Sequence, residues 1–304
     1  MNGKKILLFA APLLMTAAML SPLRAGAEIV IDPLFEYPVA PDSISTLQGK
    51  SDWVVEHFWD KMYFTGKNAV DQNALNHAMQ VYITPIQFAD PAVSEKSVGK
   101  LTERVAKSPV LSLQFAKAAE ENLYGPRSEV WGDALYLKML EPLLANKKVK
   151  KERKARYERQ ARILRNTMVG AVPPEFDYTM ADGKKAHYHP NGVITVIEFG
   201  DPDCEECSYA KLKMDTDIRF SQLVERGVVN VVFINVDPEE GWQEKLRSYP
   251  EKWHVGASDE VSDLYDLRAT PSLYVVDKEG KVAAKNVTVE QAIAIAEAIA
   301  AGEK

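Results

Sequence analysis

Residues 196–207 read Val-Ile-Glu-Phe-Gly-Asp-Pro-Asp-Cys-Glu-Glu-Cys, and this segment is the most informative about the structure of the C-terminal part of the chain. The run 193–199 is almost continuously apolar, which is typical of a strand covered on both faces. Cys204 and Cys207 follow it, where a helix is predicted to begin that runs to about residue 225. Residues at i and i+3 share one helix face, within the spacing that a disulfide needs. The stretch therefore predicts a buried strand that delivers two neighbouring thiols to the start of a helix.

The two cysteines are placed for chemistry rather than for holding the fold together. The chain has 304 residues and two cysteines, and a bridge between them closes almost no loop, so that it constrains the unfolded chain little. At a helix N-terminus the backbone N–H groups are unpaired and the helix dipole is positive, which stabilises the nucleophilic thiolate. We therefore expect Cys204 to be the exposed attacking thiol and Cys207, one turn deeper, to be the resolving thiol.

The sequence around this stretch alternates between strand and helix patterns. Its predicted elements are a hairpin (176–180 and 186–189), a second buried strand (228–236), a polar stretch containing a helix (237–253), a short helix (258–265), a second hairpin (272–276 and 281–287) and a terminal helix (289–301). Two buried parallel strands with a crossover helix, followed by a hairpin and a helix, make an α/β sandwich.

A second motif downstream completes a resemblance to the thioredoxin fold. Residues 269–277, Ala-Thr-Pro-Ser-Leu-Tyr-Val-Val-Asp, are similar to the family's cis-proline loop and the following strand, and residues 196–207 are similar to its redox motif. The region from about 170 to 304 resembles the exported TlpA-like branch, because residues 277–281 are similar to that branch's terminal hairpin. The resemblance implies a thiol–disulfide oxidoreductase. Its partners would be cysteine-containing proteins and an upstream thiol donor, and it would use neither a metal nor a cofactor.

The resemblance also implies roles for individual residues. It implies a cis bond between Thr270 and Pro271, beside the thiols, where the Thr270 backbone can hydrogen-bond an extended partner chain; an ordinary proline at a strand start is the alternative. It places Glu198, where Asp is the better-known occupant, beneath the disulfide as a proton carrier for Cys207. A carboxylate that reaches solvent is the other interpretation, although a charge in this strand is costly without a task. The implied catalytic set is Cys204, Cys207, Glu198 and Pro271, with Thr270 and Pro271 binding substrate.

Acidic residues around the thiols favour a reductase. Asp201, Asp203, Glu205 and Glu206 lie close to Cys204 in the sequence. Like charge disfavours a thiolate and so opposes the helix dipole. Because a less stabilised thiolate makes a weaker oxidant, we expect a reductase or electron-passing protein rather than a strong oxidase.

The first 27 residues predict a signal peptide. Lys4 and Lys5 precede an uncharged apolar run over 6–20, and residues 25–27, Ala-Gly-Ala, offer a small-x-small cleavage pattern. The apolar run is shorter than the about 20 residues that a membrane span needs, which makes an uncleaved anchor the weaker alternative. We expect a mature chain that begins near Glu28, lies in the periplasm or another extracytoplasmic compartment and has no stable membrane span.

Residues 28–168 indicate a helical domain of unknown role ahead of the thioredoxin-like domain at 169–304. A proline-rich lead-in over 28–42 is followed by helical periodicity through 43–167, from which we expect four to six helices. This region is similar to an uncharacterised extension upstream of such redox modules in exported bacterial proteins. The whole chain is thus predicted to be α+β. A binding protein whose helical domain carries the main activity, with an auxiliary redox module, is an alternative function.

Charge and motif spacing narrow the remaining function classes. A formal net charge of -6 gives no field that attracts nucleic acid. A zinc centre formed by the two cysteines with His187 and His189 is an alternative of a different class, although the order and spacing of these residues match no common zinc module. A thiol peroxidase ranks lower, because residues 201–203 supply neither the hydroxyl nor the cation that would activate a peroxide.

Overall fold

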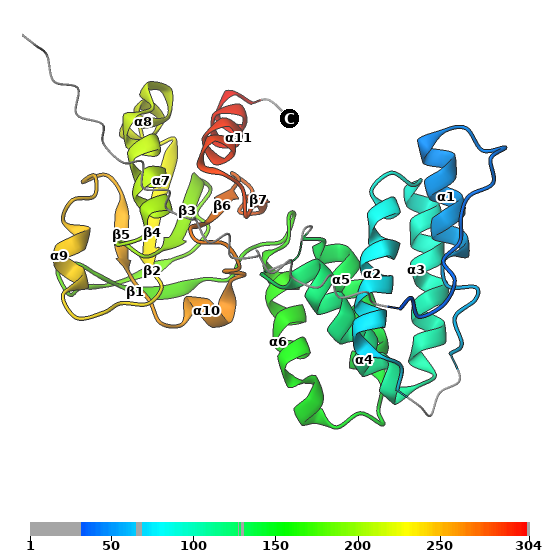
Figure 1. Cartoon of the computed structure of the whole chain (residues 1–304). Coiled ribbons are helices and arrows are strands. Elements are labelled where there is room, and N and C mark those ends of the chain that lie inside the picture. Colours follow the sequence, from blue (N-terminus) through cyan, green and yellow to red (C-terminus); the bar gives the residue numbers. More distant parts are fainter. Residues whose placement is uncertain (1–31, 65–68, 127, 129–130, 303–304) are drawn as a thin grey trace, which may run out of the picture. The chain divides into compact units, whose positions relative to one another are not determined.

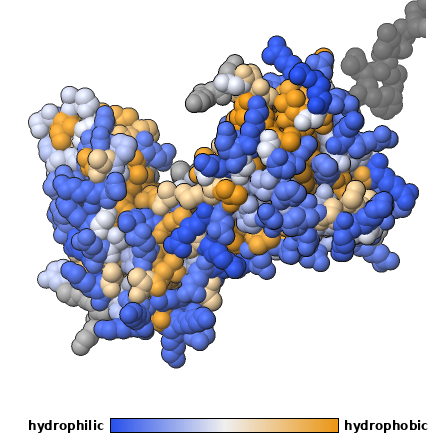
Figure 2. Space-filling view, turned by 180° about the vertical axis from the view of Figure 1, so that it is seen from behind, coloured by the Kyte–Doolittle hydropathy of each residue, from blue (hydrophilic) through white to orange (hydrophobic). Residues whose placement is uncertain are grey.

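The computed structural model describes residues 32–64, 69–126, 128 and 131–302 (Figure 1). The predicted signal peptide and the predicted start of the mature chain near Glu28 lie outside the described residues. Among the residues described, no helix combines the length and the apolarity that crossing a membrane requires. Hydrophilic side chains cover most of the face seen in Figure 2, with small apolar areas between them.

The N-terminal part is helical, at the upper end of the predicted number of helices. Short polar side chains cap several of these helices: Thr46, Asp71 and Asp90 each accept a hydrogen bond from a backbone N–H in the first turn. Among the described residues the elements are α1 (Leu47–His57), α2 (Gln72–Ile86), α3 (Pro91–Ala106), α4 (Pro109–Ala119), the π-helical turn η1 (Glu120–Tyr124), α5 (Asp133–Ala145) and α6 (Lys151–Thr167).

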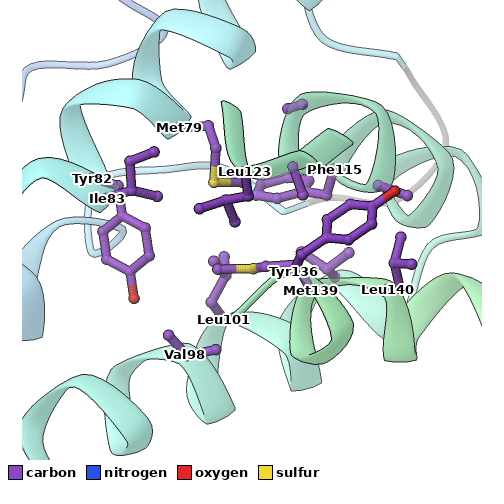
Figure 3. Packing of buried hydrophobic residues seen from close by; sticks show 14 of the residues in the cluster. Met79, Tyr82, Ile83, Val98, Leu101, Phe115, Leu123, Tyr136, Met139 and Leu140 are labelled. Atoms are coloured by element: carbon purple, nitrogen blue, oxygen red, sulfur yellow. The ribbon is translucent and has the colours of Figure 1, made fainter. Parts of the chain in front are cut away.

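The helices enclose their own apolar core. Figure 3 shows Met79, Leu101, Phe115, Tyr136 and Met139 converging from the four helices α2, α3, α4 and α5, and all five residues are buried. Burying one side chain of this size stabilises the folded state by about 1.5–3 kcal/mol relative to leaving it exposed. The helical part therefore has a core that is independent of the C-terminal sheet.

The C-terminal part is built on a seven-stranded mixed sheet of order β2-β1-β5-β4-β3-β6-β7. Strand β3 lies inside the sheet, parallel to β4 on one side and antiparallel to β6 on the other, and all its residues are buried. The strands are β1 (Phe176–Met180), β2 (Lys185–Tyr188), β3 (Ile194–Gly200), β4 (Val229–Asn235), β5 (His254–Ala257), β6 (Ser272–Val276) and β7 (Val282–Lys285).

Helices cover both faces of this sheet. Successive residues of β3 point to opposite faces, so Ile194 and Val196 pack with residues of α7, α8 and α11, whereas Ile197 and Phe199 pack with residues that include those of α10. Figure 1 shows α7, α8 and α11 on one side of the sheet and α10 on the other. The helices are α7 (Glu205–Thr216), α8 (Ile218–Glu225), α9 (Trp242–Leu246), α10 (Val261–Leu264) and α11 (Val289–Ala301).

Two predictions about elements are corrected. The helix expected through residue 225 is two helices, because the Asp217 carboxylate accepts hydrogen bonds from the N–H groups of Arg219 and Phe220 and so caps a new helix. Strand β5 was not expected; four residues are too few to show a strand pattern, yet they pair with both β4 and β1.

Candidate active site

Cys204 lies at the N-terminus of α7, held there by a tight turn after β3. The Asp203 N–H donates to the Asp201 carboxylate at 2.9 Å, and the Cys204 N–H donates to the Asp201 carbonyl at 3.1 Å. The Cys204 sulfur accepts a hydrogen bond from the Cys207 N–H at 3.2 Å, so it takes the place of a capping oxygen. An N–H donor and the positive end of a helix dipole both favour negative charge on this sulfur.

Cys207 lies one turn further along and is sealed from solvent. Its relative exposure is 0%, whereas Cys204 is half-buried, and both thiols are free. Burial raises the pKa of the Cys207 thiol, and the neighbouring Cys204 raises it further. Solvent therefore reaches Cys204 but not Cys207, and the Cys207 thiol needs a proton acceptor before it can react as a thiolate.

Gly200, the last residue of β3, makes room for the Cys207 sulfur. A Cβ atom at this position would lie 2.8 Å from Cys207 Sγ, closer than non-bonded atoms tolerate. The spacing of the cysteines gave no sign of this contact, because the close approach appears only when α7 folds back over β3.

Replacing Gly200 by alanine should displace the Cys207 thiol. We expect Gly200→Ala to lower the free energy of unfolding by about 1–3 kcal/mol, as overpacking does, and to slow thiol exchange at Cys207. Urea unfolding and single-turnover thiol exchange measure the two effects. Gly99→Ala on α3, where a Cβ meets nothing within 4 Å, is the matched control and should stabilise by about 0.5–1 kcal/mol. Equal effects of the two substitutions would contradict this packing.

Glu198 is the buried acid of the site. It lies on β3 two residues before Gly200, so both face the side of the sheet on which α7 packs. Its relative exposure is 0%, and neither carboxyl oxygen has a hydrogen-bond partner. Burial raises the pKa of Glu198 to about 8, and the charge of Lys211 opposes that rise. The charge of Glu198 in turn raises the pKa of the Cys207 thiol, so the two groups are electrostatically linked.

The proline loop ends at the same edge of the sheet as the cysteine turn. Phe199 pairs with Ser272 across β3 and β6, so Gly200 and Pro271 are the next residues outward. The Thr270–Pro271 bond is cis, as predicted, and Thr270 is exposed while Pro271 is half-buried. The fold thus brings the cysteine turn and the proline loop to one edge, although Cys207 and Pro271 are 64 positions apart in the sequence.

Comparisons with known proteins agree with this architecture. The family model described as a domain of unknown function, DUF5106, matches residues 16–167, which is half of the chain. The chain belongs to the DUF5106 family. A second model, described as a thioredoxin-like domain, matches residues 181–298. The predicted fold class, an N-terminal helical domain followed by a thioredoxin-like α/β domain, is confirmed, as is the resemblance of the C-terminal part to the thioredoxin fold.

A solved structure shows the same fold as this DUF5106 protein, and shorter thioredoxin-like structures are also similar to parts of it. A thioredoxin-like protein from Bacteroides caccae is 21% identical, with a TM-score of 0.70, over 88% of this chain and 99% of that one. The thioredoxin domain of a thiol-disulfide oxidoreductase from Bacteroides vulgatus is 19% identical (TM-score 0.37; 42% and 95% covered), and a thiol:disulfide interchange protein from a Bacteroides species is 18% identical (TM-score 0.39; 46% and 94% covered). No curated protein matches the sequence.

Three residues of the thioredoxin-like domain near the site were not singled out from the sequence. Lys211 donates to the Ser248 hydroxyl at 3.1 Å and lies 4.6 Å from the centre of the Tyr249 ring. Lys245 of α9 forms an ion pair with Asp203, beside Cys204. Lys211 could have been found, because it follows Cys207 by four residues on one helix face. Tyr249 and Lys245 come from the stretch 237–253, whose position no motif predicted.

The alternative prediction of a zinc centre in this DUF5106 protein is wrong. His187 is on β2, and β1, β5 and β4 lie between β2 and β3, so the histidine and the thiols are separated by roughly 19 Å at about 4.8 Å per strand. The His187 ring instead contacts Asp177 at 2.7 Å and Glu175 at 3.0 Å, which raise its pKa. Within residues 32–302, wherever the structure describes them, no three His, Cys, Asp or Glu side chains are grouped as a metal would require.

Proposed function

We propose that this protein is a thiol–disulfide oxidoreductase whose redox pair is Cys204 and Cys207. One observation carries the proposal: the Cys204 sulfur caps α7, 3.2 Å from the Cys207 N–H, with the Cys207 side chain buried behind it. This arrangement separates an accessible nucleophile from a protected resolving thiol. The proposal also rests on the thioredoxin-like domain that the family model matches over residues 181–298.

The reaction follows from the placement of the two thiols and the buried acid. The Cys204 thiolate attacks one sulfur of a substrate disulfide; a Cys204–substrate disulfide forms, and the other substrate sulfur leaves as a thiolate that takes up a proton. The Cys207 thiol then gives its proton to the Glu198 carboxylate and attacks Cys204 Sγ. The Cys204–Cys207 disulfide forms and the second substrate sulfur leaves as a thiolate. Two electrons pass to the substrate, and a dithiol donor protein later reduces the Cys204–Cys207 disulfide.

Charge around Cys204 supports the reducing direction. Cys204 Sγ lies 3.7 Å from the Glu206 carboxylate, and Asp201 shapes the turn before it, while Lys245 forms an ion pair with Asp203. Acidic neighbours destabilise the thiolate and therefore the reduced form, which makes a weaker oxidant and a better reductant. A potential as oxidising as about -120 mV, the value of strong periplasmic oxidants, would overturn this direction.

The site of action we propose is outside the cytosol, on protein substrates that contain cysteine. The support is the sequence of residues 1–27, with its basic start, apolar run and Ala-Gly-Ala end. Sequencing the N-terminus of the protein purified from its own cells should give Glu28 or a close neighbour. Recovery of Met1 would refute cleavage.

Trapping tests the proposed function directly. In Cys207→Ser the resolving thiol is lost, so the disulfide between Cys204 and a substrate cannot be released. We expect protein adducts on Cys204 that disappear on reduction and are seen on non-reducing gels and by mass spectrometry. Cys204→Ser is the control and should trap nothing, because Cys207 has no exposed surface. Equal adducts in both variants, or none in Cys207→Ser, would contradict the proposal.

A further inference from the structure

Arg268, two residues before Thr270, is held by residues of the helical domain. Its guanidinium makes two hydrogen bonds of 2.6 Å to the Asp266 carboxylate and a third of 2.6 Å to the carboxylate of Asp133, the first residue of α5. The guanidinium also lies 4.4 Å from the centre of the Tyr124 ring and 4.9 Å from that of Trp131. Arg268 therefore connects the start of the proline loop to the helical domain.

The connection is buried and its charges balance. The side chain of Arg268 is 8% exposed, that of Asp266 is 0% and that of Asp133 is 17%. Lys285 of β7 contacts the Asp133 carboxylate at 2.6 Å and the Asp266 carboxylate at 2.7 Å. Two carboxylates thus face two cations, and we call these four residues the loop cluster. Removing one charge from such a buried set leaves its partner uncompensated, which costs far more than an exposed pair.

Other contacts fix the same two parts of the chain. The Gly170 N–H donates to the Val282 carbonyl and the Val282 N–H donates to the Ala171 carbonyl, both at 2.8 Å, so the segment between the domains is bonded to β7. Arg159 of α6 pairs with Asp263 at 2.7 Å, on the exposed surface. Both domains belong to one structural unit, residues 33–304. These contacts join the same two parts of the chain as the loop cluster does.

We propose that the helical domain positions the substrate-binding loop 268–271. Asp133 is the positioning residue: it holds Arg268 in place, and Arg268 in turn holds the loop that binds protein substrates. The proposal rests on the function proposed above and gives the DUF5106 domain a task within it. A loop held in one geometry binds an extended protein chain without first being ordered. A small disulfide, which needs only the Cys204 sulfur, does not depend on that geometry.

The test compares two ion pairs between the domains in the full chain. Asp133→Asn removes one charge from the loop cluster at nearly constant volume; Asp263→Asn breaks the exposed pair with Arg159, away from the loop. With the disulfides of insulin as probe, we expect Asp133→Asn to raise KM about tenfold and to change kcat less than twofold. Its rate with a small aromatic disulfide should remain that of the wild type. Asp263→Asn should match the wild type with both probes. Asp133→Glu, which keeps the charge, should have a KM close to that of the wild type.

Hydrogen exchange measures the order of the loop directly and needs no substrate. Amides of residues 268–273 should exchange about tenfold faster in Asp133→Asn than in the wild type, while the sheet amides of β3 and β4 stay protected. Unchanged exchange in this loop overturns the positioning role. Faster loop exchange with an unchanged KM for insulin overturns it too, as does an equal loss with both probes. A wild type that reduces neither probe and traps no partner refutes the proposed function instead, while the exchange data still report on the loop cluster.

Discussion

Cys204→Ser should reduce no protein disulfide above the uncatalysed rate. Serine keeps the capping geometry of α7, since its hydroxyl accepts the same backbone hydrogen bond, but it has no thiolate to attack with. The remaining thiol, Cys207, has no exposed surface and a raised pKa through burial, so it cannot take over. Turbidity caused by insulin reduction, followed with dithiothreitol as donor, measures the loss.

The unfolding free energy serves as the control for this result. Because the substitution preserves the cap, Cys204→Ser should unfold within about 0.5 kcal/mol of the wild type, the range of surface substitutions. A variant that is as stable as the wild type but inactive would show that the substitution removes the reacting group and does not unfold the protein. Activity above one tenth of the wild type in Cys204→Ser would show that another group starts the reaction.

Glu198→Gln should slow the resolving step on the order of 100-fold near pH 7, the lower bound for losing a positioned acid–base group. The pKa of Glu198 is raised to about 8 by burial. The resolving rate of the wild type should therefore rise as the pH passes through about 8, because only the ionised carboxylate can accept the Cys207 proton. Stopped-flow measurement of mixed-disulfide decay against pH tests this, and Glu198→Gln should lose that rise.

The free energy of unfolding should fall as the pH rises, whereas the resolving rate should rise. The pKa of Glu198 in the folded chain, about 8, lies above its ordinary value of 4.5, so the folded chain binds more protons than the unfolded chain between these values. Stability then falls as the pH rises from about 4.5 to 8, by up to about 1.4 kcal/mol per pH unit. Glu198→Gln should lack this decline. Glu279→Gln, which changes an exposed acid in the β6–β7 turn, should retain it, and a decline of equal size in all three proteins would contradict the role of burial.

The sequence was sufficient to predict the centre of the site. A buried strand followed by Cys-x-x-Cys, and a Thr-Pro ahead of a second apolar strand, are local patterns with a direct physical meaning. Their order predicted that Cys204 and Pro271 belong to one fold, and the sheet register explains why they meet at one edge. Burial of Glu198 followed from its place in an apolar strand.

What the sequence could not show depends on contacts between distant segments. The space that Gly200 leaves for Cys207 exists only once α7 packs on β3. Lys245 reaches Asp203 from the polar stretch 237–253, whose path no short motif predicts. Asp133 and Arg268 are 135 residues apart and neither lies in a motif, so their pairing had no signal in one sequence. The capping Asp217, by contrast, was visible ahead of an apolar helix and could have been used to end the first helix.

An equilibrium titration of the two thiols against glutathione tests whether Cys204 and Cys207 form one redox pair. With thiols counted by alkylation and mass spectrometry, we expect Cys204 and Cys207 to be lost together in one two-electron transition, at a potential between about -180 and -270 mV. Thiols that stay free in fully oxidised glutathione, or that are modified one at a time without joining each other, would contradict it.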